Sequence, residues 1–345
     1  MRVVIADPPA FTPPYDHELA AALARLGADV ELVTSRFRFG AVAEPAGYRR
    51  REIFYPLSSR LFQRSPLRLP VKALEHPLGL ARLAAVRADI VHVQWLAAPE
   101  LDAWLLRHRA PLVLTAHDLL PRRTAHKTRL WRRMFGRFER IVVHSERGRR
   151  TLAEFGVPAG KLRVIPHPVS PSDPERRDDG RTVLVLGMVR PYKQIEHSAA
   201  AASAAGARLL VAGEAVGPLP PLDGAELRLG YLSAAELERA LGDSTVAVFP
   251  YRAELDQSGA LLQALGAGVP AVVYDVGGLG ETVAAYGAGR VVRPGDVAAL
   301  GSALRELLDD ESALAEARAG ALRAREELSW DAAAQAHLAL YGELA

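Results

Sequence analysis

The sequence predicts an α/β protein made of two doubly wound parallel sheets. The chain has 345 residues, enough for two domains of ordinary size. In both halves, short runs of branched aliphatic residues alternate with helical stretches, as is typical of parallel sheets covered by helices on both faces. Residues 166–181 separate the two series, because they are rich in proline and charge and have no apolar period. We therefore expect two Rossmann-like domains, 1–168 and 182–328, joined by a linker at 169–181 and facing a central cleft.

The first half opens with a β-α-β pattern. Residues 2–6 and 29–34 have the composition of buried strands, and the helix 16–26 between them is closed by Gly27. Further strands are expected at 90–94, 112–115, 141–145 and 162–165, with helical stretches between them.

The same alternation restarts in the second half. Strands are expected at 183–186, 208–212, 246–250, 271–274 and 290–293, with helices between them. Helices at 298–308, 311–328 and 330–344 follow the last strand. We expect the final one, within residues 329–345, to pack back on the N-terminal domain.

The composition excludes several kinds of site. The sequence contains no cysteine, so it offers neither a disulfide, nor a thiolate nucleophile, nor a Cys-based zinc site. Residues 1–10 indicate a strand and a proline-rich turn rather than a signal peptide. The least charged stretch, 257–274, is interrupted by glycines and a proline, so we predict no membrane span and expect a cytoplasmic protein.

The net charge of +3 conceals a strong asymmetry between the two halves. Residues 1–170 carry a net charge of +13, and the remainder carries −10. A basic half indicates an anionic partner, which is a lipid phosphate, an acidic membrane surface or nucleic acid. Mutual attraction of the two halves is the alternative explanation. No nucleic-acid-binding motif accompanies the charge, so we expect no nucleic-acid partner.

A phosphate site is indicated directly after the strand 183–186. Gly187 begins the sequence GMVRPYK, and a glycine at the carboxyl end of a strand lets the backbone approach a ligand. Arg190 provides a bidentate fork and Lys193 a point charge, a combination that suits two adjacent phosphates. The alternative is a pair of solvated surface cations.

A second polar cluster follows the strand 246–250. Ser258 and Gly259 precede a helical run whose first N–H groups suit a diphosphate. Gln263 lies one turn into this helix, within reach of a ribose or a base, and Glu254 suits sugar hydroxyls. After the next strand, Gly277 and Gly278 are expected to leave open backbone, with Glu281 behind them. A plain helix cap and a simple turn are the alternatives for this cluster.

A nicotinamide-dependent dehydrogenase has a similar architecture but is disfavoured. A dinucleotide site requires G-x-G-x-x-G after a strand, with an acidic residue about twenty positions later. Neither residues 3–14 nor 187–193 supply this pattern.

Seven motifs in order resemble glycosyltransferase family 4. They are HVQW at 92–95, TAHDLLP at 115–121, VIPHPV at 164–169, GMVRPYK at 187–193, VAGE at 211–214, GYLS at 230–233 and the segment 258–281. The likeness runs to SWD at 329–331, nearly the whole chain. It implies a GT-B fold and a retaining enzyme that uses a nucleotide-sugar donor.

The resemblance also implies roles for the donor-side residues. Arg190 and Lys193 neutralise the leaving diphosphate, so no metal or other cofactor is required, in keeping with the absence of a convincing Asp-x-Asp pattern. Glu254 matches the first glutamate of a paired motif, whereas the second position is Gln263, which loses a charge and lies one residue farther on. The remaining donor-binding positions are Gly187, Met188, Gly213, Glu214, Ser258, Gly259, Gly277, Gly278 and Glu281.

The acceptor side is expected in the N-terminal half. His117 matches a histidine that lies near the transferred sugar, where it bonds a hydroxyl, with Asp118 fixing its loop. The family's glycine-rich loop is replaced here by DPPAFTPPYDHE, whose prolines remove backbone donors. Further acceptor-binding candidates are Tyr15, His17, Trp95 and Arg122. We assign no general base.

Two basic stretches bear on the acceptor. Residues 57–74 place four cations at helical spacing, and residues 122–140 combine arginines with Trp131, Phe135 and Phe138. The second stretch suits either an interfacial helix or an ordinary core helix. We hypothesise an anionic or lipid-linked acceptor and peripheral contact with the inner face of the membrane. The alternative to a catalyst is a non-catalytic nucleotide-sugar-binding protein or partner subunit.

Overall fold

The structure is a computed structural model that describes all residues except 38–39, 61–67, 122–123 and 253–255. The chain folds as two compact units. Unit 1 comprises Met1–Pro166 and Trp330–Ala345, and unit 2 comprises His167–Ser329. Among the helices within these described residues, none combines the length and apolarity needed to cross a bilayer.

Unit 1 contains a seven-stranded parallel sheet in the order β3-β2-β1-β4-β5-β6-β7. The order reverses between β1 and β4, which is the switch point of a doubly wound sheet, where such sheets bind ligands at their carboxyl ends. The strands are β1 (Arg2–Asp7), β2 (Asp29–Ser35), β3 (Arg49–Phe54), β4 (Ile90–Val93), β5 (Leu112–Thr115), β6 (Arg140–Val143) and β7 (Leu162–Val164).

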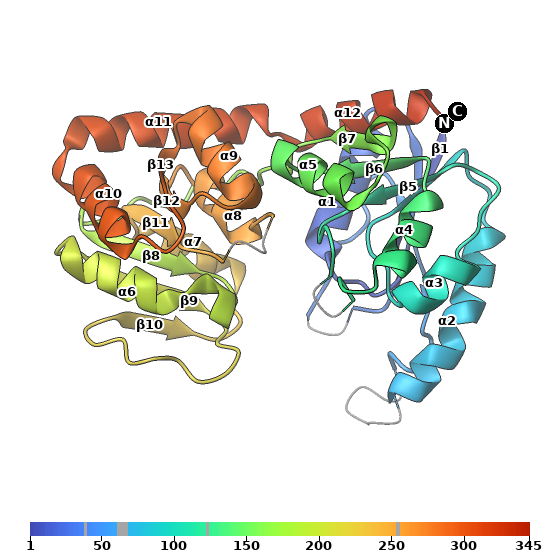
Figure 1. Cartoon of the computed structure of the whole chain (residues 1–345), viewed down its shortest axis with the longest axis horizontal. Helices are drawn as coiled ribbons and strands as arrows, with labels where there is room; N and C mark the ends of the chain where they lie inside the picture. Colours follow the sequence, from blue (N-terminus) through green and yellow to red (C-terminus); the bar gives the residue numbers. More distant parts are fainter. Residues whose placement is uncertain (38–39, 61–67, 122–123, 253–255) are drawn as a thin grey trace. The chain divides into compact units, whose positions relative to one another are not determined.

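Helices cover both faces of this sheet (Figure 1). One face packs against the first and last helices of the chain, α1 (Pro13–Arg25) and α12 (Trp330–Gly342). The other face packs against α2 (Arg68–Ala84), α3 (Pro99–Leu105), α4 (Thr128–Gly136) and α5 (Glu146–Phe155). Alternate strand residues therefore enter two separate hydrophobic clusters.

Unit 2 repeats the plan with six parallel strands in the order β10-β9-β8-β11-β12-β13. Its switch point lies between β8 and β11. The strands are β8 (Thr182–Leu186), β9 (Arg208–Gly213), β10 (Glu226–Leu229), β11 (Val246–Phe249), β12 (Ala271–Tyr274) and β13 (Gly289–Val292). Its helices are α6 (Ile195–Ala204), α7 (Ala234–Gly242), α8 (Gly259–Gly266), α9 (Gly277–Tyr286), α10 (Val297–Asp309) and α11 (Glu311–Glu327). Each unit also has a short 3-10 helix, η1 (Ala159–Lys161) in unit 1 and η2 (Pro191–Lys193) in unit 2.

The stretch expected to be a linker is packed against unit 2. Val169 belongs to the hydrophobic core of that unit, and its N–H donates to the Leu328 carbonyl. Asp178 forms ion pairs with Arg176 and Arg318 and accepts a hydrogen bond from Thr245. The segment lacks regular secondary structure, yet these contacts fix it in place.

The structure tests the two basic stretches to different extents. Within 57–74 it describes helix α2 from Arg68 onward, with Lys72 Nζ 4.4 Å from the Tyr55 ring centroid, while 61–67 lie outside the described residues. In α4, the apolar side chains are buried in the core of unit 1, so this helix has no apolar face left for a membrane. The core-helix alternative is the correct one for α4.

Candidate functional site

Lys193 lies at the carboxyl end of β8, beside the switch point of the unit 2 sheet. Its side chain is only 4% exposed, and Nζ donates a hydrogen bond to the carbonyl of Leu186, the last residue of β8. Burial, and secondarily the nearby Arg190 guanidinium, lower the pKa of Lys193 to about 7. The amine is therefore poised to gain a proton when an anion arrives.

Arg190 stands beside Lys193 but is exposed. Its Nη2 lies 3.2 Å from the Met188 sulfur, and its charge is close enough to contribute to the shifted Lys193 pKa. The two predicted phosphate ligands thus lie together, one buried and one free to reorient. An anion between them would satisfy two charges that otherwise repel each other.

Two glycines let backbone segments meet at this point. Gly187 has φ +80°, and a Cβ there would lie 3.4 Å from Lys193 Nζ and 3.5 Å from Ala260 Cβ in the first turn of α8. Gly213, at the end of β9, has φ +143°, and a Cβ there would clash with the Gly187 carbonyl. The ends of β8 and β9, the lysine and the start of α8 therefore surround one small region.

The start of α8 is held by a serine cap. Ser258 Oγ accepts a hydrogen bond from the Leu261 N–H (3.2 Å) and donates to the Tyr251 hydroxyl (3.4 Å). Gly259, the first residue of the helix, is exposed. Tyr251 is buried, and its ring centroid lies 5.4 Å from Lys193 Nζ. Sequence reasoning missed Tyr251, which links the cap to the lysine.

A pocket of about 370 Å³ adjoins this region. It brings together four predicted donor-side residues, Gly187, Met188, Gly213 and Glu214, with Gln263 from α8. The rest of the lining is Leu186, Gly230, Tyr231, Leu232, Ala234 and Leu237. Tyr231 is 76% exposed, so its ring is free to stack on a planar group. The volume is suitable for a small-molecule ligand.

The Gly277 and Gly278 prediction requires a correction. Both residues are buried, and the Gly278 N–H donates to the Asp256 carbonyl (2.6 Å), so this backbone is not open. A Cβ at Gly278 would overlap the amide end of the Gln257 side chain, so this side chain covers the glycine. Glu281 lies half-buried on α9. Glu254 falls outside the described residues.

In unit 1, His117 lies between two aromatic rings near the carboxyl end of β5. The Trp95 ring stacks on it (centroids 5.1 Å apart, interplanar angle 15°), and Tyr15 meets it edge-on (4.8 Å, 89°). Trp95 is fixed in turn by its Nε1–H donating to Thr12 Oγ1 (2.8 Å). The structure thus brings three predicted acceptor residues together.

Both ring nitrogens of His117 have polar neighbours. His144 Nδ1 lies 2.9 Å from the Ile165 carbonyl oxygen, and His144 Nε2 lies 3.4 Å from His117 Nδ1. His117 Nε2 lies 3.0 Å from Gln94 Oε1, an oxygen that accepts hydrogen bonds. Gln94 and His144 were missed by sequence reasoning, although each lies next to the carboxyl end of a predicted strand.

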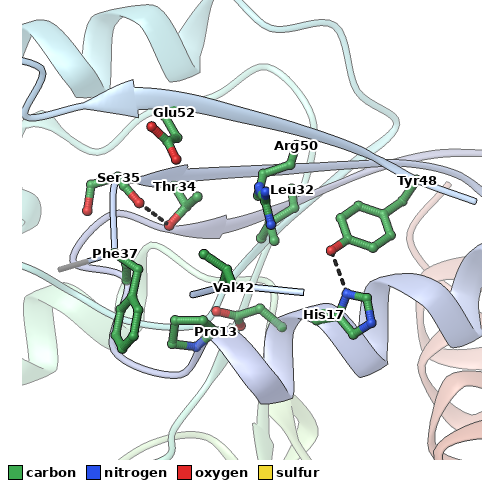
Figure 2. Close-up of a pocket in the computed structure, with 12 residues that line it drawn as sticks. Pro13, His17, Leu32, Thr34, Ser35, Phe37, Val42, Tyr48, Arg50 and Glu52 are labelled. Carbon is green, nitrogen blue, oxygen red and sulfur yellow. Dashed lines mark hydrogen bonds between the residues drawn. The ribbon is translucent and has the colours of Figure 1, made fainter. Parts of the chain in front are cut away.

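The other predicted acceptor residues are placed differently. Asp118 is exposed and lines a shallow pocket with His117 and Trp95. His17 lies in a separate pocket between α1 and the β2-β3 edge (Figure 2), where the Tyr48 hydroxyl is 2.9 Å from its Nδ1. That pocket has room for about one water molecule (about 20 Å³). His17 and His117 line different pockets, so the structure does not bring these two predicted residues together. Arg122 lies outside the described residues.

Two buried carboxyls lie at the end of β1 and in the first turn of α1, next to Tyr15 in the sequence. Asp7, at the end of β1, and Asp16, on α1, are both almost fully buried, and Asp7 accepts a hydrogen bond from the Thr12 N–H (3.2 Å). Burial and the neighbouring Asp7 hold the pKa of Asp16 well above its usual value. The sequence alone did not indicate this buried carboxyl pair.

Two models of known protein families match the sequence. The family model described as Glycosyltransferase Family 4 matches residues 15–173, and the one described as Glycosyl transferases group 1 matches residues 180–310. Together they span most of the chain. The chain belongs to the family 4 glycosyltransferases.

Relatives of this glycosyltransferase agree with its fold. Glycogen synthase of Mycobacterium tuberculosis is 38% identical over 115 residues, which is 33% of this chain and 27% of that protein. The chain thus matches about a quarter of the length of that relative. Sucrose-phosphate synthase from Thermosynechococcus elongatus has a TM-score of 0.75 at 20% identity, covering 100% of this chain and 99% of the other. Anabaena HepE in complex with UDP-glucose has a TM-score of 0.68 at 15% identity, with both chains fully covered. These likenesses confirm the predicted GT-B fold of two doubly wound units.

Several residues predicted for the donor and acceptor sides come from one kind of position. His117, Arg190 and Gly213 lie at or shortly after the carboxyl ends of parallel strands, where doubly wound sheets bind ligands. Among the described residues, there is no group of three or more His, Cys, Asp or Glu side chains that could hold a metal ion.

Proposed function

We propose that this glycosyltransferase moves a sugar from a nucleoside diphosphate to an acceptor hydroxyl with retention of configuration, without a metal ion. The observation that carries the proposal is the pair Arg190 and Lys193 at the end of β8, with Lys193 buried beside the first turn of α8. A helix start and two cations form a strong site for a diphosphate.

The same pair accounts for catalysis. Glycosyl transfer passes through an oxocarbenium-like state while negative charge grows on the leaving phosphate. Cations placed at that phosphate bind the transition state more strongly than the ground state, and this difference accelerates the reaction. Lys193, with its pKa lowered to about 7, would be fully protonated once the diphosphate is bound.

The nucleoside is proposed to occupy the pocket of about 370 Å³. Gln263 would bond a ribose hydroxyl or a base edge, and the exposed ring of Tyr231 offers a stacking surface. We favour a uridine or guanosine diphosphate sugar, and uridine first, since HepE, which shares the fold, has been solved with UDP and with UDP-glucose.

The acceptor is proposed to bind unit 1 near His117. The Trp95 and Tyr15 rings hold that imidazole, and its contacts with Gln94 and His144 orient it. Apolar ring faces and a hydrogen-bonding edge suit a sugar or another polyol hydroxyl. We propose an anionic or lipid-linked acceptor on the basis of the +13 charge in residues 1–170.

A non-catalytic nucleotide-sugar-binding protein is the second candidate. Gln263 stands where the paired-glutamate motif has its second carboxylate, and proline replaces the glycine-rich loop after β1. Both changes could leave binding intact while removing turnover. A nicotinamide-dependent dehydrogenase has less support, since no dinucleotide motif follows either β1 or β8.

The deciding experiment measures nucleoside diphosphate release from UDP- and GDP-sugars, with and without sugar or lipid-linked acceptors, in buffer containing EDTA. We expect turnover of one donor, and at least about a hundredfold loss in Lys193→Ala and Arg190→Ala, because each removes a charged contact to the leaving group. Arg239→Ala, at an exposed arginine on α7, is the matched control and should retain activity.

Each alternative function or mechanism predicts a different result in these experiments. Donor binding without turnover of any donor would establish the non-catalytic candidate. Dependence on added metal would overturn the metal-free mechanism, and an anomeric configuration in the product opposite to that of the donor would overturn retention. Binding of NAD alone would contradict the donor site itself.

A further inference from the structure

Unit 2 contains a second pocket, of about 490 Å³, to which the proposed reaction assigns no ligand. It shares no lining residue with the pocket of about 370 Å³ that we assign to the nucleoside. Its walls come from the start of η2, the first turn of α6, the loop 216–220 and the segment that follows β11. The volume is large enough for a small organic molecule.

Backbone contacts hold the walls of this second pocket in place. The Val189 N–H donates a hydrogen bond to the Glu214 carbonyl (2.8 Å), and the Val216 N–H donates to the Val189 carbonyl (3.0 Å). Pro218 and Pro220 fix two backbone φ angles in the loop that follows. The pocket is therefore formed before a ligand arrives, so a ligand loses little affinity to ordering of the protein.

Two exposed arginines line the second pocket. Arg190 directly precedes η2, and Arg252 follows β11. The Arg252 N–H donates to the Tyr192 carbonyl of η2 (3.0 Å), which holds the two arginines on adjacent segments. Arg228 and Arg318 of the same unit form ion pairs with carboxylates. Within the described part of the chain, the Arg252 side chain has neither an ion pair nor a hydrogen bond, so its charge is available to a ligand.

The second pocket carries a positive charge on a mostly apolar lining. Among the described residues that line it, Glu196 is the one acidic side chain against two arginines, which gives a net charge of +1. Ile195, Val216 and Leu219 provide aliphatic surface. A guanidinium binds two phosphate oxygens at once, and the Glu196 carboxylate accepts hydrogen bonds from hydroxyl groups. Because aliphatic walls suit an organic body, the combination favours an organic phosphate over a free inorganic anion.

Arg190 connects the second pocket with the donor site. Its Nη2 lies 3.2 Å from the sulfur of Met188, and Met188 lines the pocket assigned to the nucleoside. The planar guanidinium presents its fork to one phosphate at a time. A phosphate bound in the second pocket would therefore draw Arg190 away from the diphosphate and place negative charge beside it. Both effects oppose binding of the nucleotide, and the opposition is reciprocal because it is a coupling free energy.

We propose that the second pocket binds an organic phosphate through Arg190 and Arg252, and that this ligand weakens binding of the nucleoside diphosphate by competing for Arg190. The existence of the site is independent of the proposed reaction. The competition rests on the proposed function, because it requires Arg190 to be a ligand of the diphosphate.

Phosphorus NMR tests the site without a nucleotide. Phenyl phosphate is titrated with the full chain carrying Lys193→Met, in which the diphosphate site is weakened, and the broadening of its phosphorus signal gives the dissociation constant. Adding Arg252→Gln should weaken binding at least about tenfold, because it removes a charged contact to the phosphate. Arg252 is exposed, so the melting temperature should be unchanged.

Arg293→Gln in the same background is the matched control, because Arg293 is also an exposed arginine that follows a strand of this sheet, β13. It should leave the affinity for phenyl phosphate unchanged. Inorganic phosphate should bind more weakly, because only the phenyl ring contacts the aliphatic walls. The site is overturned if Lys193→Met does not bind phenyl phosphate, if adding Arg252→Gln leaves its affinity unaltered, or if inorganic phosphate binds equally well.

Titration calorimetry with UDP tests the competition. Saturating phenyl phosphate should raise the dissociation constant of UDP at least about fivefold in the unchanged protein, and less in Arg252→Gln. No rise, or an equal rise in both proteins, would contradict competition through this pocket. If UDP does not bind at all, the proposed donor site fails, whereas the phosphorus NMR titration still decides whether the pocket binds an organic phosphate.

Discussion

Lys193 is the side chain whose chemistry the fold changes most. An amine that is 4% exposed loses most of its hydration, and its hydrogen bond to the Leu186 carbonyl does not compensate for an ammonium charge. The pKa therefore falls from 10.5 to about 7. A dianionic ligand reverses that balance, because it stabilises the protonated form.

This predicts pH-dependent binding of the nucleoside diphosphate. Only the protonated lysine attracts the ligand, so affinity should fall roughly tenfold for each pH unit above 7, until the raised pKa of the complex is reached. Titration calorimetry in buffers of different ionisation heat should show proton uptake at pH 8. Lys193→Met, similar in length but neutral, should bind weakly without this slope. An affinity that stays constant to pH 9 in the unchanged protein would contradict the assignment.

At the scale of elements, the donor site depends on how closely β8 and β9 approach each other. The Gly187 N–H donates to the Ala212 carbonyl, and the Gly213 α-carbon faces the Gly187 carbonyl directly. Gly213 at the end of β9 and Gly187 just after β8 both have positive φ, and a side chain at Gly213 would displace the Gly187 carbonyl. The β8 end positions Lys193, so any displacement of it is transmitted to the lysine.

Gly213→Ala is expected to disrupt this contact. The new methyl group would clash with the Gly187 carbonyl in addition to imposing backbone strain, so we expect a loss of several kcal/mol and of diphosphate binding. Gly230→Ala separates the two effects, because Gly230 also has positive φ (+132°) but open space around its α-carbon. It should cost only about 1–3 kcal/mol. Urea unfolding and ligand titration of both variants would reveal the difference, and equal costs would show that the clash is relieved cheaply.

The elements themselves were largely predictable, except for two of the four edge strands. Buried strands read as continuous apolar runs, and those predicted agree with the structure within one or two residues. The edge strands β3 and β10 were missed, because Arg49–Phe54 begins with three arginines and Glu226–Leu229 alternates charge with leucine. Edge strands contact only one neighbour and tolerate such charges, so their sequences lack the apolar signal.

At the scale of the whole molecule, the sequence indicated which candidate residues follow parallel strands but not what they contact. His117, Trp95 and Arg190 could be proposed as site residues because each follows a strand of a parallel sheet, at the edge where such sheets bind ligands. The stacking of Trp95 on His117 and the His144 hydrogen bond depend on rotamers and loop paths, which no local pattern specifies. The Lys193 pKa likewise depends on burial, a property of the assembled unit.

Unit 1 is completed only by the far end of the chain. Helix α12 supplies Tyr341, whose hydroxyl lies 2.6 Å from His92 Nδ1, and His337, whose Nδ1–H donates to the Ala333 carbonyl (2.8 Å). His92 in turn faces Thr115 with its Nε2 (2.7 Å). Both imidazoles are fully buried, and burial lowers both pKa values, that of His337 to about 4. The docking of α12 therefore requires neutral histidines.

Acid should weaken the docking of α12, because the pKa of His337 is lower in the folded chain than in the unfolded chain. Between pH 6.5 and about 4 the unfolded chain binds a proton at His337 and the folded chain does not, so stability is lost as pH falls through that range. For this one residue, the loss from pH 7 to pH 5 is about 2 kcal/mol. His337→Leu removes the titrating group, and its unfolding free energy should depend less on pH by that amount. His126→Leu, at an exposed position, should keep the original dependence. Urea unfolding of the full chain, followed for unit 1 at pH 7 and pH 5, measures the difference. If the free energy of unfolding of His337→Leu changed with pH as much as that of the unchanged protein, α12 would accommodate a charged imidazole.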